Sequence, residues 1–291
     1  MPGSERGIPF QLRNLHEGER YIKIGETLFK LPTSASKELS PDGEVIKVLS
    51  KQGGRLVLEH DYSYVTKAGS AIVASEVEAM RLVLKHTSVP LPEIIYTQIS
   101  TNYGHIGMTI IPGSPLELTW NTLDDKTKKS VCRETWDLIT KLRQISQPPE
   151  LRGLFQCLAD GSPTRDPLIE DLEEPRRPLL TDEDLRARIY ERYLYFGGLR
   201  YKDQLPQMLP RSSYTVFTHA DIAPRNIMVD EKNRITGILD WEYAGWYPDY
   251  WEYAQIMRPA CRTGDWQKWM NLTAPQKWDI TGIAAARRVL F

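Results

Sequence analysis

Cysteine is scarce in this chain of 291 residues, which contains only Cys132, Cys157 and Cys261. The three are far apart and form no CxxC pair, so the sequence offers neither a zinc site nor a disulfide framework and predicts a reducing compartment. No apolar run approaches the ~20 residues of a membrane helix, and no signal-peptide core is visible near the start. We therefore expect a cytoplasmic protein without a membrane partner.

An excess of either charge is also missing. The 37 Lys and Arg residues nearly balance the 38 Asp and Glu residues, so no overall positive field attracts nucleic acid, and we expect no nucleic-acid partner. Hydrophobic residues at 41% and charged residues at 26% match soluble globular proteins, so the whole chain should fold. At ~150 residues a domain, the length allows two domains or one unit with two lobes.

The first part of the chain has the pattern of a small antiparallel sheet. Residues 21–67 alternate short β-rich runs with turn residues, and two further strand-like runs cover 93–97 and 105–111. Between them a single helix is expected, because apolar residues recur on one helical face. These residues are Val73, Val77, Met80 and Leu84. The pattern predicts an N-terminal lobe over residues 1–111.

From residue 112 onward the pattern is mainly helical. Helices are expected after Asp124 and over 181–199, with short strands between the second helix and residue 239. Residues 146–180 are rich in proline and acidic side chains, which predicts an irregular insertion on the surface. The fold class is therefore α+β, with a larger, mainly helical C-terminal lobe over residues 112–291.

Three polar residues between the short strands carry the chemistry. Asp221 is followed five residues later by Asn226, and Asp240 comes 14 residues beyond that, at the end of a strand pair. A hairpin would bring all three to one mouth. Asp221 could accept a proton from a hydroxyl group, while Asn226 and Asp240 supply the hard oxygen ligands that Mg²⁺ prefers. This spacing fits Mg-dependent phosphoryl transfer.

The segment from His219 to Asn226 matches the H-x-D-x-x-x-x-N catalytic loop of the protein-kinase-like fold, with Asp240 as the later metal-binding Asp. Ala220 stands where protein kinases have Arg, Leu-Asp-Trp-Glu replaces D-F-G, and no A-P-E follows. The chain instead resembles the aminoglycoside-phosphotransferase and choline-kinase family, most closely its branch in filamentous fungi. The resemblance covers roughly residues 45–260 and implies a bilobal fold, with Asp221 and His219 in the catalytic loop and His219 bracing it.

Two lysines compete for the nucleotide phosphates. Lys47 lies in one strand-like run, and Lys67 ends another. In the family that the chain resembles, a strand ending in Val-x-Lys-x-Gly precedes a Glu-bearing helix, which favours Lys67 and pairs it with Glu76. Helical geometry agrees, because Glu76 lies near the apolar face whereas Glu78 points to the opposite side, where it can complete a capping box with Ser75.

Other nucleotide contacts are less specific in the sequence. The resemblance places main-chain groups of the segment ending in Ile110 and Ile111 along the adenine. The chain has no GxGxxG, and residues 50–55 could either cover phosphates or form an ordinary hairpin turn. Arg225 could touch a phosphate or be a solvated charge on the loop.

Seven aromatic residues crowd residues 241–253. They could line an acceptor pocket that stacks an aromatic substrate or holds a cation, or they could pack the larger lobe. Within this segment, Glu242 and Trp246 are the candidates for acceptor contact.

The sequence thus predicts a phosphotransferase that uses ATP and Mg²⁺ and moves the γ-phosphoryl group to a hydroxyl of a small molecule. The alternative is a non-catalytic kinase-like protein that binds nucleotide or metabolite. The intact set of Asp221, Asn226 and Asp240 favours the enzyme, whereas the missing glycine-rich loop favours the binder. A protein kinase is a weaker option.

Overall fold

The computed structural model describes residues 8–9, 14–31, 43–259 and 264–290, so Cys261 lies outside the described residues. The chain divides into two compact units. The first consists of Met1–Val77 and Pro92–Ile110, and the second of Glu78–Leu91 and Ile111–Phe291. None of the helices in the described ranges combines the length and apolarity that crossing a bilayer requires.

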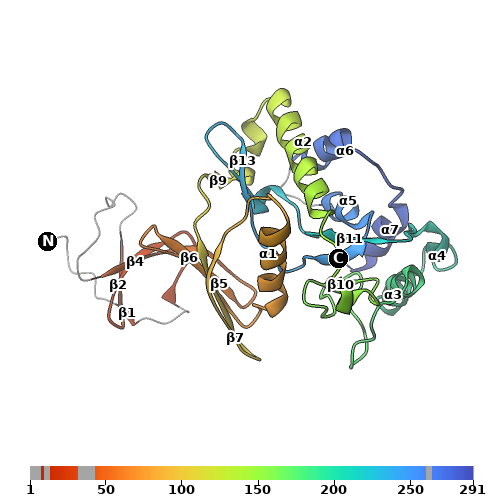
Figure 1. The fold of residues 1–291 in the computed structure, drawn as a ribbon, viewed down its shortest axis with the longest axis horizontal. Coiled ribbons are helices and arrows are strands. Elements are labelled where there is room, and N and C mark those ends of the chain that lie inside the picture. The colour runs from red at the N-terminus through yellow and green to blue at the C-terminus, as the bar shows by residue number, and fades with distance from the viewer. Residues whose placement is uncertain (1–7, 10–13, 32–42, 260–263, 291) are drawn as a thin grey trace. The chain divides into compact units, whose positions relative to one another are not determined.

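An antiparallel sheet of eight strands forms most of the first unit (Figure 1), in the order β1-β3-β2-β4-β5-β6-β8-β7. Its β4–β5 hairpin turns at Gly53-Gly54, where both residues have positive φ and so need glycine. The strand-like runs predicted over 21–67, 93–97 and 105–111 are confirmed, and Ile8–Pro9 is a further strand that was not predicted. The eight strands follow in chain order. They are β1 (Ile8–Pro9), β2 (Arg20–Ile24), β3 (Thr27–Lys30), β4 (Glu44–Gln52), β5 (Arg55–His60), β6 (Tyr64–Gly69), β7 (Ile94–Ile99) and β8 (Gly104–Thr109).

The predicted helix after the hairpins is α1 (Ala74–His86). Its first turn belongs to the first unit, where Val77 is buried against Ile72, Ile106 and Met108. Of the four apolar residues expected on one helical face, Val77 and Met80 are buried, whereas Val73 precedes the helix and Leu84 is exposed. A separate cluster fills the other part of the sheet and consists of Leu15, Tyr21, Leu28, Ile46, Val48, Leu56 and Leu58.

Helices and two small sheets make up the second unit. Trp136 of α2 donates its indole N–H to the Met270 carbonyl of α6 at 3.0 Å, and these two helices are neighbours (Figure 1). The helices are α2 (Asp125–Leu142), α3 (Asp182–Tyr195), α4 (Leu205–Met208), α5 (Trp251–Ile256), α6 (Trp266–Thr273) and α7 (Thr281–Leu290). Single 3-10 turns cover Leu116–Leu118, Trp120–Thr122, Pro149–Leu151 and Pro224–Asn226.

The two sheets of the second unit have three strands each, in the orders β10-β14-β11 and β13-β12-β9. Their strands are β9 (Ser114–Pro115), β10 (Cys157–Leu158), β11 (Thr215–Thr218), β12 (Ile227–Val229), β13 (Ile235–Ile238) and β14 (Gly245–Pro248). The aromatic residues of 241–253 are mostly buried, which supports their packing role. Trp246, at 1% exposure, stacks edge-on against Phe217, so the expectation that it contacts an acceptor is wrong.

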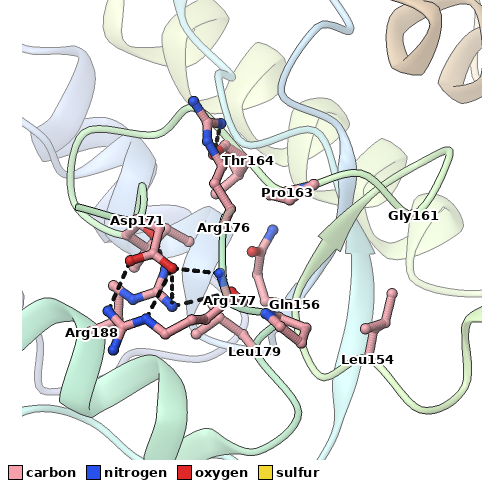
Figure 2. A pocket seen from close by; sticks show the side chains of 12 residues that line it. Leu154, Gln156, Gly161, Pro163, Thr164, Asp171, Arg176, Arg177, Leu179 and Arg188 are labelled. Atoms are coloured by element: carbon pink, nitrogen blue, oxygen red, sulfur yellow. Dashed lines mark hydrogen bonds and ion pairs between the residues drawn. The ribbon is translucent and has the colours of Figure 1, made fainter. Parts of the chain in front are cut away.

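Residues 146–180 are irregular as expected, but they are not a surface insertion. Leu168, Ile169 and Leu179 belong to the main hydrophobic core of the unit, and β10 pairs with β14. Gln156 bridges to Leu179, and the segment lines a pocket of about 60 Å³ (Figure 2).

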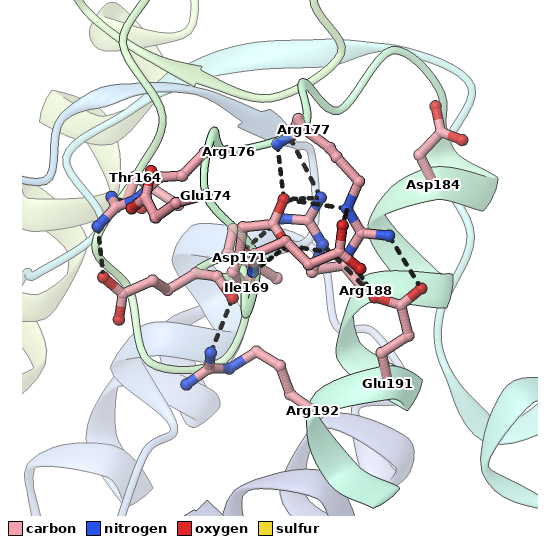
Figure 3. Close-up of polar contacts among 12 residues, drawn as sticks. Thr164, Ile169, Asp171, Glu174, Arg176, Arg177, Asp184, Arg188, Glu191 and Arg192 are labelled. Atoms are coloured by element: carbon pink, nitrogen blue, oxygen red, sulfur yellow. Dashed lines mark hydrogen bonds and ion pairs between the residues drawn. The ribbon is translucent and has the colours of Figure 1, made fainter. Parts of the chain in front are cut away.

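Buried charge explains how this segment can enter the core. The Asp171 side chain is 1% exposed and accepts from Arg177 and Arg188 at 2.8 and 2.9 Å (Figure 3). Arg192 of α3 donates to the Pro167 and Glu170 carbonyls. These arginines neutralise the acidic run and satisfy backbone carbonyls that no sheet or helix pairs, so an irregular polar segment can be buried.

Candidate functional site

The β12–β13 hairpin brings Asn226 and Asp240 to the same end. Ile227 pairs with Ile238, and Leu239 donates its backbone N–H to the Asn226 carbonyl at 2.8 Å. Asn226 thus immediately precedes β12 and Asp240 follows β13, so both lie at the open end of the hairpin, opposite its turn. Asp240 has φ 66°, a left-handed backbone conformation that redirects the chain as it leaves the hairpin.

Asp221 joins this pair through Asn226. The Asn226 Nδ2 donates to the backbone carbonyl and to Oδ2 of Asp221, both at 2.9 Å, and both side chains are buried. A 3-10 turn over Pro224–Asn226 folds the loop back so that these contacts can form. Because Nδ2 is directed at Asp221, the Asn226 amide oxygen is the atom that could ligate a cation.

His219 connects the loop to the hairpin with both ring nitrogens. Nε2 donates to the Leu239 carbonyl at 3.0 Å, and Nδ1 accepts the Asp221 backbone N–H at 3.2 Å. The ring also lies edge-on to Trp241 at 4.6 Å between centroids. Burial lowers the pKa of His219, which keeps the imidazole neutral with its proton on Nε2. These contacts give His219 the bracing role expected of it.

Glu252 supports the same loop from α5 and was missed in the sequence. Its Oε2 accepts the backbone N–H of His219 at 2.8 Å and that of Ala220 at 3.3 Å. Ala220 has φ 65°, so this carboxylate holds a residue in a strained left-handed conformation. Burial raises the pKa of Glu252 to about 7. A carboxylate between Trp251 and Tyr253 needs a buried partner, which is the signal that could have identified it.

Two arginines contact the Asp221 carboxylate. Arg225, from the same loop, donates to Oδ2, and Arg258, which follows α5, donates to Oδ1 at 2.9 Å. The sequence offers a phosphate contact or a solvated charge for Arg225, and does not predict its contact with Asp221. Arg258 was missed because no local pattern links it to a residue 37 positions earlier.

In the first unit, Lys67 and Glu76 form a buried ion pair. The Lys67 Nζ lies 2.7 Å from Glu76 Oε1, and the side chains are 8% and 3% exposed. Glu78 lies instead near Arg81 on the exposed side of α1, at 3.9 Å. Lys47 sits on β4 opposite Glu59 and is partly exposed. Of the two candidate lysines, Lys67 is the one that the fold aligns with Glu76.

Ile110 and Ile111 follow β8 and are partly exposed. Ile111 packs over Gly237 of β13, where an added Cβ would lie 2.7 Å from Ile111 Cγ2. Glycine at 237 therefore allows the chain after β8 to cover the hairpin closely. Residues 50–55 form the tip of the β4–β5 hairpin, with its turn at Gly53-Gly54.

The pocket beside residues 146–180 contains none of the expected site residues. Its volume of about 60 Å³ is well below the ~300 Å³ at which ligand pockets begin. Its arginines Arg177 and Arg188 are engaged with Asp171, which Figure 2 also shows. We assign this pocket no part in the chemistry.

The loop and hairpin geometry agrees with a match at the family level. The model of the family described as "Phosphotransferase enzyme family" matches residues 25–272. The chain belongs to this phosphotransferase family. The matched range includes both the strand that carries Lys67 and the segment from His219 to Asp240. A comparison with curated proteins gives no significant match.

Solved structures similar to this phosphotransferase share the kinase-like α+β fold. The ADP-bound aminoglycoside phosphotransferase APH(2'')-Ib is 12% identical with a TM-score of 0.56, and 84% of this chain aligns with 80% of that one. APH(2'')-IIa, in its gentamicin complex, is 13% identical with the same coverage and TM-score. The type VIII aminoglycoside-3'-phosphotransferase is 16% identical over 84% and 93% of the two chains, with a TM-score of 0.53. The predicted fold class is confirmed, whereas the fungal branch stays a prediction.

Proposed function

We propose that this phosphotransferase moves the γ-phosphoryl group of ATP to a hydroxyl group of a small molecule in a reaction that requires Mg²⁺. The observation that carries the proposal is the pair of hydrogen bonds from Asn226 to Asp221 at the mouth of the hairpin that ends in Asp240. They order a proton acceptor and an oxygen ligand side by side, which phosphoryl transfer needs.

Asp221 is proposed as the base. As the acceptor oxygen attacks the γ-phosphorus, its proton passes to an Asp221 carboxylate oxygen, the bond from the γ-phosphorus to the bridging oxygen breaks, and ADP leaves. His219 does not transfer protons, because both ring nitrogens are hydrogen-bonded to backbone groups, and it positions Asp221 instead.

The donor set at the hairpin mouth fits Mg²⁺. The amide oxygen of Asn226 and the carboxylate of Asp240 are hard oxygen ligands, and the Asn226 amide is already oriented by Asp221. Bound there, the ion would neutralise charge on the transferring phosphates. Lys67, oriented by Glu76, is proposed to bind the α- and β-phosphates, with Lys47 as the alternative. The main chain at Ile110 and Ile111 is proposed to contact the adenine. The cytoplasm stays the expected location.

A second candidate is a protein that binds nucleotide without transferring phosphate. It is favoured by the two guanidinium groups on Asp221, since both carboxylate oxygens already accept hydrogen bonds from cations. A base in that state cannot take a proton until one contact is released.

The Asp221→Asn variant separates the two candidates. The amide keeps the shape of the loop but cannot accept the proton, so Mg·ATP should still raise the melting temperature while turnover falls by a factor on the order of 10² or more. Slow ATP hydrolysis serves as the assay before an acceptor is found. Asp230→Asn, in the exposed turn between β12 and β13, is the matched control and should leave hydrolysis unchanged. Equal hydrolysis by wild type and Asp221→Asn, despite binding, would establish the non-catalytic candidate.

A further inference from the structure

The Asp221 carboxylate is covered on both oxygens. Oδ2 accepts from Asn226 and from Arg225, whereas Oδ1 accepts from Arg258 at 2.9 Å. A hydroxyl group that is to give its proton to Asp221 must therefore displace a donor. The donor at Oδ1 is the simpler one for an acceptor hydroxyl to replace. Arg258 comes from outside the loop, and Asn226 can stay bound at Oδ2 during the exchange.

Both guanidinium groups have the capacity to bind a second anion. The Arg225 side chain is 44% exposed and the Arg258 side chain 39% exposed, and each uses one nitrogen for Asp221. Arginine has five N–H donors in a planar fork that matches the oxygens of a carboxylate or a phosphate. Solvent can reach both groups, so a ligand can as well.

The charges around Asp221 disfavour a cationic acceptor. Two guanidinium groups face one carboxylate, and His219 is held neutral by burial. The Glu252 carboxylate points at backbone N–H groups, and Asp240 is assigned to the metal under the proposed function. An ammonium group brought to Asp221 would lie beside two arginines, at a cost of like-charge repulsion.

We infer that the acceptor of this phosphotransferase carries an oxyanion, a carboxylate or a phosphate ester, close to its reactive hydroxyl, and that Arg258 recognises it. On binding, Arg258 exchanges its contact with Asp221 Oδ1 for the acceptor's anion, and the acceptor hydroxyl reaches the released oxygen. One charge-assisted hydrogen bond is replaced by another, so the exchange costs little, while a neutral or cationic alcohol offers no such replacement. The inference rests on the proposed function and names its substrate class.

Matched acceptors test the charge preference. Glycerate, glycerol 3-phosphate, glycerol and serinol share a three-carbon skeleton with a free hydroxyl and differ in charge, and 4-hydroxyphenylacetate, tyrosol and tyramine form an aromatic set. Phosphoryl transfer and melting-temperature shifts are measured for each with Mg·ATP and the full chain. The anionic members should be preferred in kcat/KM, or in binding, by about ten-fold to a hundred-fold. The carboxylate and phosphate members distinguish the two kinds of oxyanion.

Variants of Arg258 test the exchange itself. Arg258→Gln should raise acceptor-independent ATP hydrolysis, because Oδ1 is released to water, and should abolish the preference for anionic acceptors. Arg258→Lys should restore part of that preference. Arg234→Gln is the control, since Arg234 forms a pair with Asp230 at the same i,i+4 spacing as Arg225 with Asp221 but away from the site. It should change neither quantity.

The two failures can be told apart. If wild-type hydrolysis equals that of Asp221→Asn, the proposed function fails. If hydrolysis depends on Asp221 but neutral or cationic members are used equally well or better, or no anionic member binds or reacts, the inference about the acceptor is wrong. If Arg258→Gln instead raises the KM for ATP and leaves acceptor preference unchanged, Arg258 serves the nucleotide phosphates and the inference is likewise wrong.

Discussion

The Glu252 carboxylate accepts the backbone N–H of His219 at 2.8 Å. This contact fixes the start of the loop over residues 219–226 from a helix more than thirty residues later in the chain. Glu252 is 1% exposed, and its burial raises its pKa to about 7. The loop that carries Asp221 is therefore supported by an acid that titrates near neutral pH.

This support makes stability depend on pH. Below about pH 4.5 Glu252 is protonated in both the folded and the unfolded chain. Between about pH 4.5 and about 7 the unfolded chain has released this proton while the folded chain still holds it, so the free energy of unfolding falls as the pH rises. The total fall is about 3 kcal/mol once the pH exceeds 7. Glu252→Gln cannot release a proton and should lack this fall. Chemical denaturation of both proteins at pH 5 and pH 8 measures it. If the free energy of unfolding changes equally with pH in both proteins, Glu252 is not the group responsible. His219 is present in both proteins, so its contribution cancels in the comparison.

Lys67→Ala should weaken nucleotide binding more than Lys47→Ala. Lys67 is held by Glu76 at 2.7 Å within a buried pair, whereas Lys47 lies partly exposed on β4. Titration of Mg·ADP followed by calorimetry gives both affinities, with circular dichroism to verify folding. Glu76→Gln is the matched control and should lose less affinity than Lys67→Ala, because the lysine remains. A larger loss in Lys47→Ala would move the phosphate contact to β4.

Asp240→Ala should abolish the part of the ATP-induced melting shift that requires Mg²⁺. The variant removes a carboxylate from the hairpin mouth, while the hairpin itself is held by backbone pairing between β12 and β13. The measurement compares ATP with Mg²⁺ and ATP with a chelator. Since Asp240 has φ 66°, Asp240→Asn keeps a residue that tolerates this backbone and should show a smaller loss. An unchanged Mg²⁺-dependent shift in both variants would remove Asp240 from the metal site.

Asp171→Ala should destabilise the protein by about 3–5 kcal/mol, because it leaves the buried Arg188 without its carboxylate partner. Burial raises the pKa of Asp171, but hydrogen bonds from Arg177 and from the Glu173 backbone, together with the charge of Arg188, hold it well below its ordinary value. Asp230→Ala, which breaks the exposed pair with Arg234, should change stability little. Urea denaturation of the two variants makes the comparison. Equal effects would mean that the polar contacts of Figure 3 do not support the core.

Local sequence was enough to predict that the loop after β11 and the ends of the β12–β13 hairpin come together. Asp221, Asn226 and Asp240 are close in the chain, and a two-stranded hairpin with short strands has few ways to arrange them. The pairing of Lys67 with Glu76 came from the family resemblance and from the helical position of Glu76, and the 2.7 Å contact agrees with it. In each case the geometry depends on a single short connection.

Tertiary contacts limited the rest. Glu252 and Arg258 reach the loop only after α5 has packed, and no spacing rule connects them to Asp221. The prolines and acids of 146–180 have the composition of an exposed segment, but in the folded chain Arg188 of α3 pairs with Asp171 and Arg192 donates to the Glu170 backbone carbonyl. Composition describes a segment alone, whereas burial depends on the partners that it finds.

The β10-β14-β11 sheet has a consequence for how the protein is made on the ribosome. Its central strand, β14, is the last of the three in the chain, so neither Cys157–Leu158 nor Thr215–Thr218 can join the sheet until Pro248 has emerged. The sheet of the first unit, by contrast, is complete once Thr109 has been translated. During synthesis β10 and β11 therefore lack their central partner until β14 has been made, and unpaired strand edges of this kind are prone to associate with other chains.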